Sequence, residues 1–204
     1  MYLGLVDVGV GNIGSLKSAL DKIGVKYQIC KQAEDFSNIN KLILPGVGNF
    51  NDFMNKIKNK NLDKIIKEKY KKNIPIFGIC LGFQVLFSNS SESGFTEGLD
   101  FINGKIINFK EKLDTLRTPH VGWNNCSIEK KSTLFENVGN NSDFYFTHSF
   151  YLDDCNKDYI ISKTDYGFPF ISAVEKENLY GVQFHPEKSQ LSGMKVLKNF
   201  CERC

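Results

Sequence analysis

The sequence predicts an α/β fold, a doubly wound and mostly parallel sheet flanked by helices, with added antiparallel strands in the C-terminal half. Up to Cys80, strand-like apolar runs alternate with helix-like patterns, which is the order typical of parallel sheets. The run from Ile74 to Ile79 is continuously apolar, as expected of a strand that is covered on both faces. After Gly104 the strand-like runs become shorter, which indicates the antiparallel additions.

In the first half we expect four strands and two helices. The strands are predicted at residues 3–8, 25–30, 42–44 and 74–79. The first helix follows the first strand, because its apolar residues recur every three or four positions after Asn12, which can serve as the N-cap. One long, lysine-rich helix is predicted between the third and fourth strands. In such sheets the site lies at the carboxyl ends of the strands, where three glycine-rich turns fall.

In the second half we expect five short strands and a final helix. The strands are predicted at residues 105–109, 144–147, 159–163, 171–175 and 180–184, and the helix at about 193–201. Because the sequence shows no internal repeat, linker or low-complexity tract, we expect a single domain over residues 1–204.

Composition disfavours several classes of protein. The 204 residues are 41% hydrophobic and 24% charged, with a net charge of +3, which is typical of a globular protein. The lysines alternate with apolar residues at helical spacing, which predicts a solvated helix face and no nucleic-acid partner. No signal peptide opens the chain and no apolar run approaches the ~20 residues of a membrane span, so no membrane association is expected.

The six cysteines lack the density of a disulfide framework. We therefore expect a reducing, cytoplasmic compartment. The terminal Cys201-Glu202-Arg203-Cys204 has no second pair of ligands, so neither a metal ion nor another cofactor is expected. Gly9-Val10-Gly11-Asn12 lacks the third glycine of a dinucleotide turn, which excludes a nicotinamide site.

Gly78-Ile79-Cys80-Leu81-Gly82 is the thiol version of the Gly-x-Ser-x-Gly elbow, a sharp strand-to-helix turn that presents a nucleophile. The start of the following helix favours the thiolate through its dipole and its N–H groups. The alternative is a buried cysteine that only ends a strand. The buried strand before Cys80 and Gln84 one helical turn later favour the catalytic interpretation.

A general base for this thiol is sought among three histidines, His120, His148 and His185. Only His185 has a strand before it and a carboxylate, Glu187, two residues after it. Such a carboxylate can fix the tautomer of the imidazole and stabilise the imidazolium. If residues 74–79 and 180–184 are strands of one sheet, these groups meet at its edge and form a unit for covalent acyl transfer.

Pro45-Gly46-Val47-Gly48 ends a neighbouring predicted strand. Pro-Gly is most often a tight turn. At this place, however, the glycine N–H groups can also face an acyl oxygen and serve as an oxyanion hole.

These motifs resemble the class I (triad) glutamine amidotransferases and, among them, the glutaminase subunits of imidazole glycerol phosphate synthase. The resemblance covers residues 7 to 189 and rests on the elbow and on five further segments: Asp7-Val8-Gly9-Val10-Gly11-Asn12, Pro45-Gly46-Val47-Gly48, Pro119-His120-Val121-Gly122-Trp123-Asn124, Thr147-His148-Ser149 and Gly181-Val182-Gln183-Phe184-His185-Pro186-Glu187-Lys188-Ser189.

The resemblance implies a role for each matching residue. It implies a Cys80, His185 and Glu187 triad, with Val47, Gly48 and Leu81 at the oxyanion hole. The residues implied to bind glutamine are Gly46, Gln84, Glu92, His148, Ser149 and Phe150, although a solvated surface carboxylate is the alternative for Glu92. It also implies a heterodimer with a (β/α)8 cyclase, contacted by Asn12, Trp123 and Asn124, which receives the ammonia and forms imidazole glycerol phosphate and AICAR in histidine biosynthesis.

Three alternatives stay open on the sequence. Val8, Phe83 and Phe150 depart from the pattern of these subunits, and paralogues supply ammonia for the amidination of a surface-polysaccharide sugar. A hydrolase or peptidase would use the same triad without a partner. A non-catalytic binding module would keep the elbow as a relic.

Overall fold

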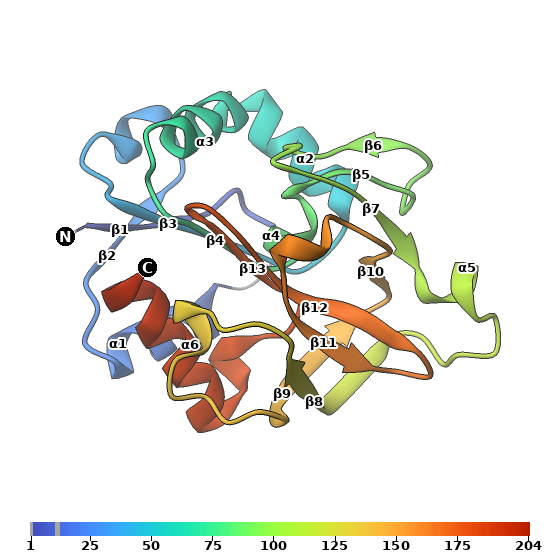
Figure 1. The fold of residues 1–204 in the computed structure, drawn as a ribbon. Coiled ribbons are helices and arrows are strands. Elements are labelled where there is room, and N and C mark those ends of the chain that lie inside the picture. Colours follow the sequence, from blue (N-terminus) through green and yellow to red (C-terminus); the bar gives the residue numbers. More distant parts are fainter. Residues whose placement is uncertain (1, 11–12) are drawn as a thin grey trace.

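Five parallel strands form the centre of the structure. The computed structural model describes residues 2–10 and 13–204. In it the central strands lie in the order β2 (Tyr27–Cys30), β1 (Leu3–Val6), β3 (Lys41–Gly46), β4 (Ile76–Cys80) and β13 (Leu179–Val182), each parallel to its neighbours (Figure 1). Because β4 and β13 are adjacent and parallel, the segments that follow them begin at the same edge of the sheet.

Helices cover both faces of this sheet (Figure 1). The helices α2 (Phe50–Asn59) and α3 (Leu62–Lys71) bury their apolar residues in one hydrophobic cluster. The helices α1 (Gly14–Lys22) and α6 (Gln190–Arg203) contribute to a second cluster, which also contains Leu3, Leu5 and Phe77 of the central strands. The predicted fold class, a doubly wound α/β sheet with antiparallel additions, is confirmed.

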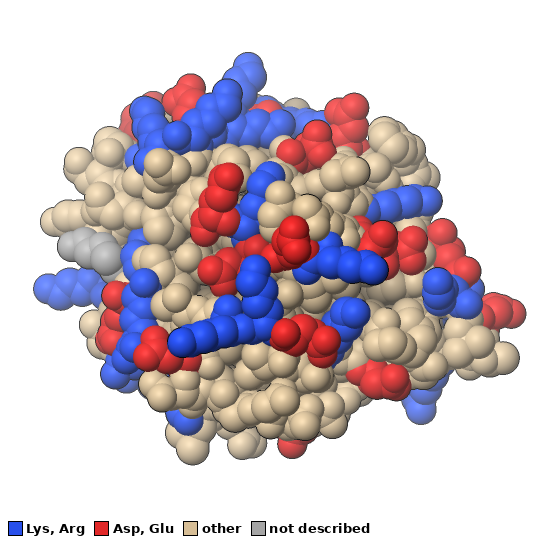
Figure 2. Space-filling model, viewed as in Figure 1, with Lys and Arg blue, Asp and Glu red and all other residues tan. Residues whose placement is uncertain are grey.

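The prediction of one long lysine-rich helix is wrong, since the segment forms α2 and α3. Asn61 separates them with a left-handed backbone, at φ 54° and ψ 22°, which asparagine adopts more readily than most residues. The lysines of the two helices are mostly exposed, as expected. Figure 2 shows Lys and Arg interspersed with Asp and Glu on the face in view, without one continuous basic surface.

The C-terminal half extends the sheet with more strands than the sequence predicted. The path continues from β13 through β12 (Pro169–Lys176), β10 (Phe150–Leu152), β7 (Ile102–Asn108), β5 (Phe87–Ser90) and β6 (Thr96–Glu97). A branch from β12 runs through β11 (Ile160–Asp165) and β8 (His120–Ile128) to β9 (Ser142–His148). The strands β5, β6, β8 and β10 were not predicted; in β8 the inward positions 120, 122 and 124 are His, Gly and Asn, so apolar alternation is missing.

Short helices connect these strands. They are the α-helices α4 (Leu81–Gln84) and α5 (Phe109–Lys112), and the 3-10 helices η1 (Ala33–Phe36), η2 (Thr133–Phe135), η3 (Lys157–Tyr159) and η4 (Pro186–Lys188). The predicted N-cap Asn12 lies outside the described residues. No helix in the part of the chain that the structure describes is long and apolar enough to span a membrane.

Candidate active site

Cys80 ends β4 in a strained backbone conformation, with φ 54° and ψ −106°. A positive φ is uncommon for a residue with a side chain, and such strain is concentrated at functional sites. The turn also requires glycine at position 82, because a Cβ there would overlap the carbonyl oxygen of Leu44 on β3. This close approach packs the elbow directly against the strand that leads into residues 45–48.

The helix after the elbow, α4, has only four residues. The helix dipole that we expected to favour the thiolate is therefore small, since the macrodipole requires many aligned peptide units. Two groups lie near the sulfur instead. The Gln183 side-chain amide places Nε2 at 3.8 Å from Cys80 Sγ, and the backbone carbonyl oxygen of Thr147 lies 4.0 Å away. An amide N–H that faces the sulfur stabilises its negative charge.

His185 and Glu187 interact directly. The 3-10 helix η4 begins after His185, and its tight turn brings Glu187 Oε1 to 2.8 Å from His185 Nδ1. Both side chains are buried, and His185 Nε2 has no hydrogen-bond partner. Burial alone lowers the pKa of His185, but the negative charge of the Cys80 thiolate and the hydrogen bond with Glu187 outweigh burial and raise it to about 10. The imidazolium form of His185 is thus favoured.

A cavity of about 280 Å³ opens on the Cys80 side of these groups. Its lining brings together most of the residues expected to bind glutamine or its oxyanion: Val47, Gly48, Cys80, Leu81, Gln84, Glu92, Pro119, Thr147, His148, Ser149 and Phe150. Gly46 does not line this cavity; it lines a second one. The larger cavity combines donors and acceptors from five separate segments of the chain.

Glu92 is held at the edge of this cavity and is not a freely solvated carboxylate. Its Oε2 accepts a hydrogen bond of 2.7 Å from the backbone N–H of Phe50, the first residue of α2. Burial raises the pKa of Glu92, and this hydrogen bond partly opposes the rise. A half-buried carboxylate of this kind suits the recognition of an ammonium group.

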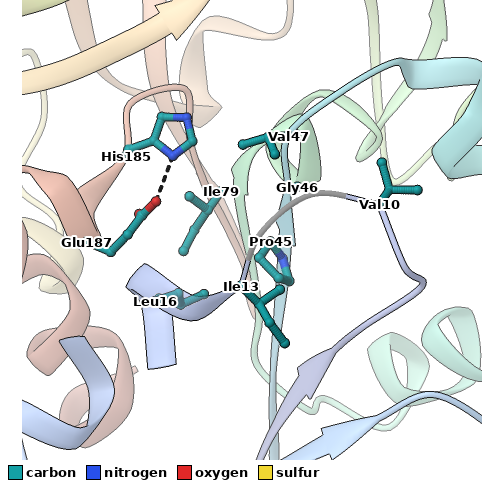
Figure 3. A pocket seen from close by; sticks show the side chains of 9 residues that line it. All are labelled: Val10, Ile13, Leu16, Pro45, Gly46, Val47, Ile79, His185 and Glu187. Carbon is teal, nitrogen blue, oxygen red and sulfur yellow. Dashed lines mark hydrogen bonds and ion pairs between the residues drawn. The ribbon is translucent and has the colours of Figure 1, made fainter. Parts of the chain in front are cut away.

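A second, much smaller cavity of about 20 Å³ lies beside His185 and Glu187, which line it (Figure 3). Its lining is otherwise mainly apolar and comes from Val10, Ile13, Leu16, Pro45, Gly46, Val47 and Ile79. Val47 lines both cavities. The segment 45–48 is therefore the wall between them.

The residues expected at the partner interface are placed differently from one another. Trp123 lies on β8 with 48% of its surface exposed, next to exposed Val121. Asn124 is half-buried on the opposite face of the strand and donates a hydrogen bond of 2.7 Å to the carbonyl oxygen of Asp165. Asn12 is outside the described residues, so nothing is concluded about its position.

Neither the position of Gln183 near Cys80 nor the contact between His120 and His148 was predicted from the sequence. Gln183 precedes His185 by two residues, so the alternation of an extended strand could have indicated that both approach Cys80. The histidine pair joins β8 to β9, and β8 itself was not predicted.

Comparison with known proteins agrees with this geometry. The model of the family Glutamine amidotransferase class-I matches residues 4–204. The chain belongs to the class-I glutamine amidotransferase family. The predicted enzyme class is therefore confirmed, whereas the role of each site residue stays a prediction.

Two relatives of this amidotransferase are similar over almost their whole length. The "Imidazole glycerol phosphate synthase subunit HisH 2" of Methanococcus maripaludis is 44% identical over 202 residues, which cover 98% of this chain and 99% of that protein. The "Imidazole glycerol phosphate synthase subunit HisH 1" of Campylobacter jejuni subsp. jejuni serotype O:23/36 is 41% identical over 199 residues, with 97% and 98% coverage.

Solved structures share the fold at lower identity. The structure of PurLQS from Thermotoga maritima aligns with a TM-score of 0.76 at 18% identity, covering 98% of this chain and 96% of that one. This likeness supports the fold of the amidotransferase. Among the described residues, no three His, Cys, Asp or Glu side chains are grouped to hold a metal ion.

Proposed function

We propose that this chain is the glutaminase subunit of an imidazole glycerol phosphate synthase, which hydrolyses glutamine and passes the ammonia to a cyclase subunit in histidine biosynthesis. The observation that carries the proposal is the strained nucleophile Cys80, which lines a cavity together with Gln84 and whose charge acts on the adjacent His185–Glu187 pair. The two relatives named above support the choice of synthase.

In the first half-reaction the Cys80 thiolate attacks the side-chain amide carbon of glutamine. The carbonyl π electrons move to oxygen, and the backbone N–H groups of Leu81 and of the loop at Val47 and Gly48 stabilise this oxyanion. His185, protonated beside the thiolate, then gives its Nε2 proton to the departing nitrogen. Ammonia leaves and the γ-glutamyl thioester of Cys80 remains.

In the second half-reaction water replaces ammonia. The now neutral His185 accepts a proton from a water molecule as its oxygen attacks the thioester carbon. The C–S bond breaks, glutamate leaves and the thiolate is restored beside the imidazolium. Glu187 keeps the proton of His185 on Nδ1 throughout, so that Nε2 faces the reacting atoms.

The free amino acid groups of glutamine are assigned to the opposite end of the cavity. Glu92 binds the ammonium group, while Gln84 and the segment His148-Ser149-Phe150 bind the carboxylate end. Gly46 supports the loop that separates the two cavities. This arrangement places the side-chain amide of glutamine toward Cys80.

The partner is proposed to be a (β/α)8 cyclase that receives ammonia before it is protonated and lost. It docks on the surface that includes Trp123, with Asn12 as a further proposed contact. The chain alone is expected to have little glutaminase activity, because the peptide into Val47 turns its N–H toward the oxyanion only when partner and ligand bind. All six cysteines are free thiols, which supports a reducing cytoplasm as the compartment.

The test is glutamate release from glutamine by the purified chain, with and without the cyclase encoded beside it, and with the histidine-pathway ribonucleotide intermediate in both cases. Strong stimulation that requires both partner and ligand is the expected result. Full-rate hydrolysis by the isolated chain would refute the gated loop, and turnover of peptides but not glutamine would indicate a hydrolase instead.

Labelling separates the chemistry from the pathway. A glutamine-analogue electrophile is expected to alkylate Cys80 and no labelling is expected in Cys80→Ser, which would exclude a non-catalytic module. Binding of the cyclase without stimulation by the histidine intermediate, but with stimulation by a nucleotide-linked sugar, would reassign the ammonia to surface-polysaccharide synthesis and leave the Cys80 chemistry intact.

A further inference from the structure

A chain of polar side chains runs from β8 to the larger cavity, and its outer members, His120 and Asn124, have no part in the mechanism above. His120 on β8 and His148 on β9 are directly paired across the two strands. They are 2% and 6% exposed. His120 Nδ1 lies 3.1 Å from His148 Nε2. Buried polar groups of this kind must be matched donor to acceptor, so the position of each proton can be deduced.

The first proton is fixed by a carbonyl group. His148 Nδ1 lies 2.7 Å from the backbone oxygen of Phe150, which can only accept, so Nδ1 carries the hydrogen. Burial lowers the pKa of His148 to about 3, so the ring is neutral near pH 7. A neutral imidazole has one donor and one acceptor. His148 Nε2 is therefore the acceptor in its contact with His120.

The position of the proton on His120 follows from its position on His148. His120 must donate through Nδ1, and burial lowers the pKa of His120 to about 4, so this ring is neutral too and its Nε2 accepts. The donor to it is Asn124 Nδ2, at 3.3 Å. The orientation of this amide is fixed twice: its nitrogen also donates to the Asp165 carbonyl at 2.7 Å, and its oxygen accepts from the Asn125 N–H at 2.9 Å.

The other end of the chain reaches the nucleophile. The Phe150 carbonyl oxygen also accepts a hydrogen bond of 3.0 Å from Gln84 Nε2. The same nitrogen donates to Gln183 Oε1 at 3.1 Å, which leaves Gln183 Nε2 facing Cys80 Sγ. Each hydrogen bond named between Asn124 and Cys80 thus has an assigned donor and acceptor.

We propose that His120 and Asn124 are positioning residues of the glutaminase site, which hold His148 in its Nδ1–H tautomer and thereby fix the Phe150 carbonyl and Gln84. If His148 carried its proton on Nε2 instead, its Nδ1 would face the Phe150 oxygen as a second acceptor and repel it. The segment that lines the cavity would then move. The inference rests on the proposed function in assigning that segment to glutamine binding.

The tautomers can be measured directly, without any activity assay. The chain has three histidines, so ring ¹H–¹⁵N correlation spectra of the full chain labelled with ¹⁵N-histidine contain three sets of signals. We expect both His120 and His148 as neutral Nδ1–H tautomers, the less common form in water, and His185 as an imidazolium. A His148 ring that carries its proton on Nε2 would overturn the proposal.

Substitution of His120 tests the consequence for the substrate. In His120→Phe the ring still stacks on Phe146 and Tyr166, but it no longer donates to His148. We expect His148 to lose its single tautomer and the KM for glutamine, measured with the cyclase partner, to rise about fivefold to tenfold, the contribution of one hydrogen bond, with a smaller change in kcat. In His120→Asn an amide donor replaces Nδ1, and we expect the KM to recover.

Tyr166→Phe is the matched control. It removes a hydroxyl that donates to the Arg117 carbonyl and leaves the stack and the histidine pair in place, so tautomers and KM should not change. Asn124→Asp is the second variant, because its carboxylate only accepts and draws the proton of His120 onto Nε2. It should displace the His148 tautomer even if His120→Phe does not fold.

The outcomes separate this proposal from the proposed function. Correct tautomers with an unchanged KM in both His120→Phe and Asn124→Asp would refute the positioning role. Correct tautomers in a chain that hydrolyses no glutamine with any partner would instead refute the proposed function, since the histidine chain would then hold a site for another substrate.

Discussion

The two cavities near Cys80, His185 and Glu187 differ in size by an order of magnitude and in the residues that line them. The one beside Cys80 measures about 280 Å³ and is lined by polar groups such as Gln84, Glu92 and His148. The one beside His185 and Glu187 measures about 20 Å³ and is mostly apolar. A cavity of that size holds about one water molecule. We therefore expect glutamine to occupy the larger cavity.

The contrast between the two cavities also indicates a role for the segment 45–48, which separates them. Val47 lines both, and Gly48 adopts φ 119°, a conformation that is strained for residues with a Cβ. A rotation of a peptide in this wall moves an N–H group between the apolar side and the substrate side. In the proposed mechanism, this wall is where we expect the oxyanion hole to open or close.

The largest loss of kcat is expected for Glu187→Gln, which alters a member of the predicted triad. The amide can present a donor to His185 Nδ1 and favours the wrong tautomer, as in triads where such a change costs roughly ten-thousandfold in kcat. Single-turnover glutamate release with the cyclase measures it. Glu202→Gln, at an exposed pair with Lys198, is the control. A loss of less than tenfold in Glu187→Gln would argue against the triad.

Gly48→Ala is expected to have the next largest effect, because it changes the wall between the cavities. The backbone of an alanine at this position must adopt φ 119° or force the loop to move, and its Cβ would lie 3.1 Å from Val10 Cγ1. We expect a roughly hundred- to thousandfold loss of kcat, the cost of one oxyanion donor, with partner binding retained. Gly139→Ala, where a Cβ meets only ordinary contact, should leave kcat unchanged.

Leu16→Ala tests whether the small cavity is only structural. Leu16 is buried on α1 and lines this cavity. Its truncation is expected to reduce the free energy of unfolding by about 2–5 kcal/mol, measured by urea denaturation, without raising the KM for glutamine. The exposed Leu191→Ala should do neither. A raised KM in Leu16→Ala would show that substrate also contacts the small cavity.

A loss of stability is also expected in acid. His120 and His148 stay neutral in the folded chain, with pKa values lowered by burial to about 4 and about 3 from 6.5. Below pH 6.5 the unfolded chain therefore binds more protons than the folded one. The free energy of unfolding then decreases as the pH decreases, by about 1.4 kcal/mol per pH unit for each proton. Urea unfolding between pH 6.5 and 4.5 measures the slope of the free energy of unfolding against pH. His120→Phe should reduce this slope by the contribution of one proton.

The parallel half of the molecule and its nucleophile could be predicted from sequence. Strands β1, β3 and β4 are buried on both faces, so their apolar runs are easily recognised in the sequence. The glycines around Cys80 indicate a turn in which no Cβ fits. The pairing of His185 with Glu187 could be predicted because it is local, over two residues.

The antiparallel half could be predicted less well. The outward residues of β8 include Val121 and Trp123, and the inward ones are polar, which reverses the usual pattern of a half-buried strand. The hydrogen bonds that justify this reversal come from β9 and from the Asp165 carbonyl, far away in the sequence. Gln183 gains its place near Cys80 in the same way, through the neighbouring strand β4.

Because His120 and His148 are directly paired across β8 and β9, a shift of the strand register would break their contact completely. Side chains in a strand alternate between faces, so a hairpin that slips by one residue turns its whole inward row outward. Strand β8 therefore cannot adjust the histidine contact by sliding gradually along β9. We therefore expect a displacement of β8 to reach the larger cavity by bending the hairpin as one body or by moving a proton.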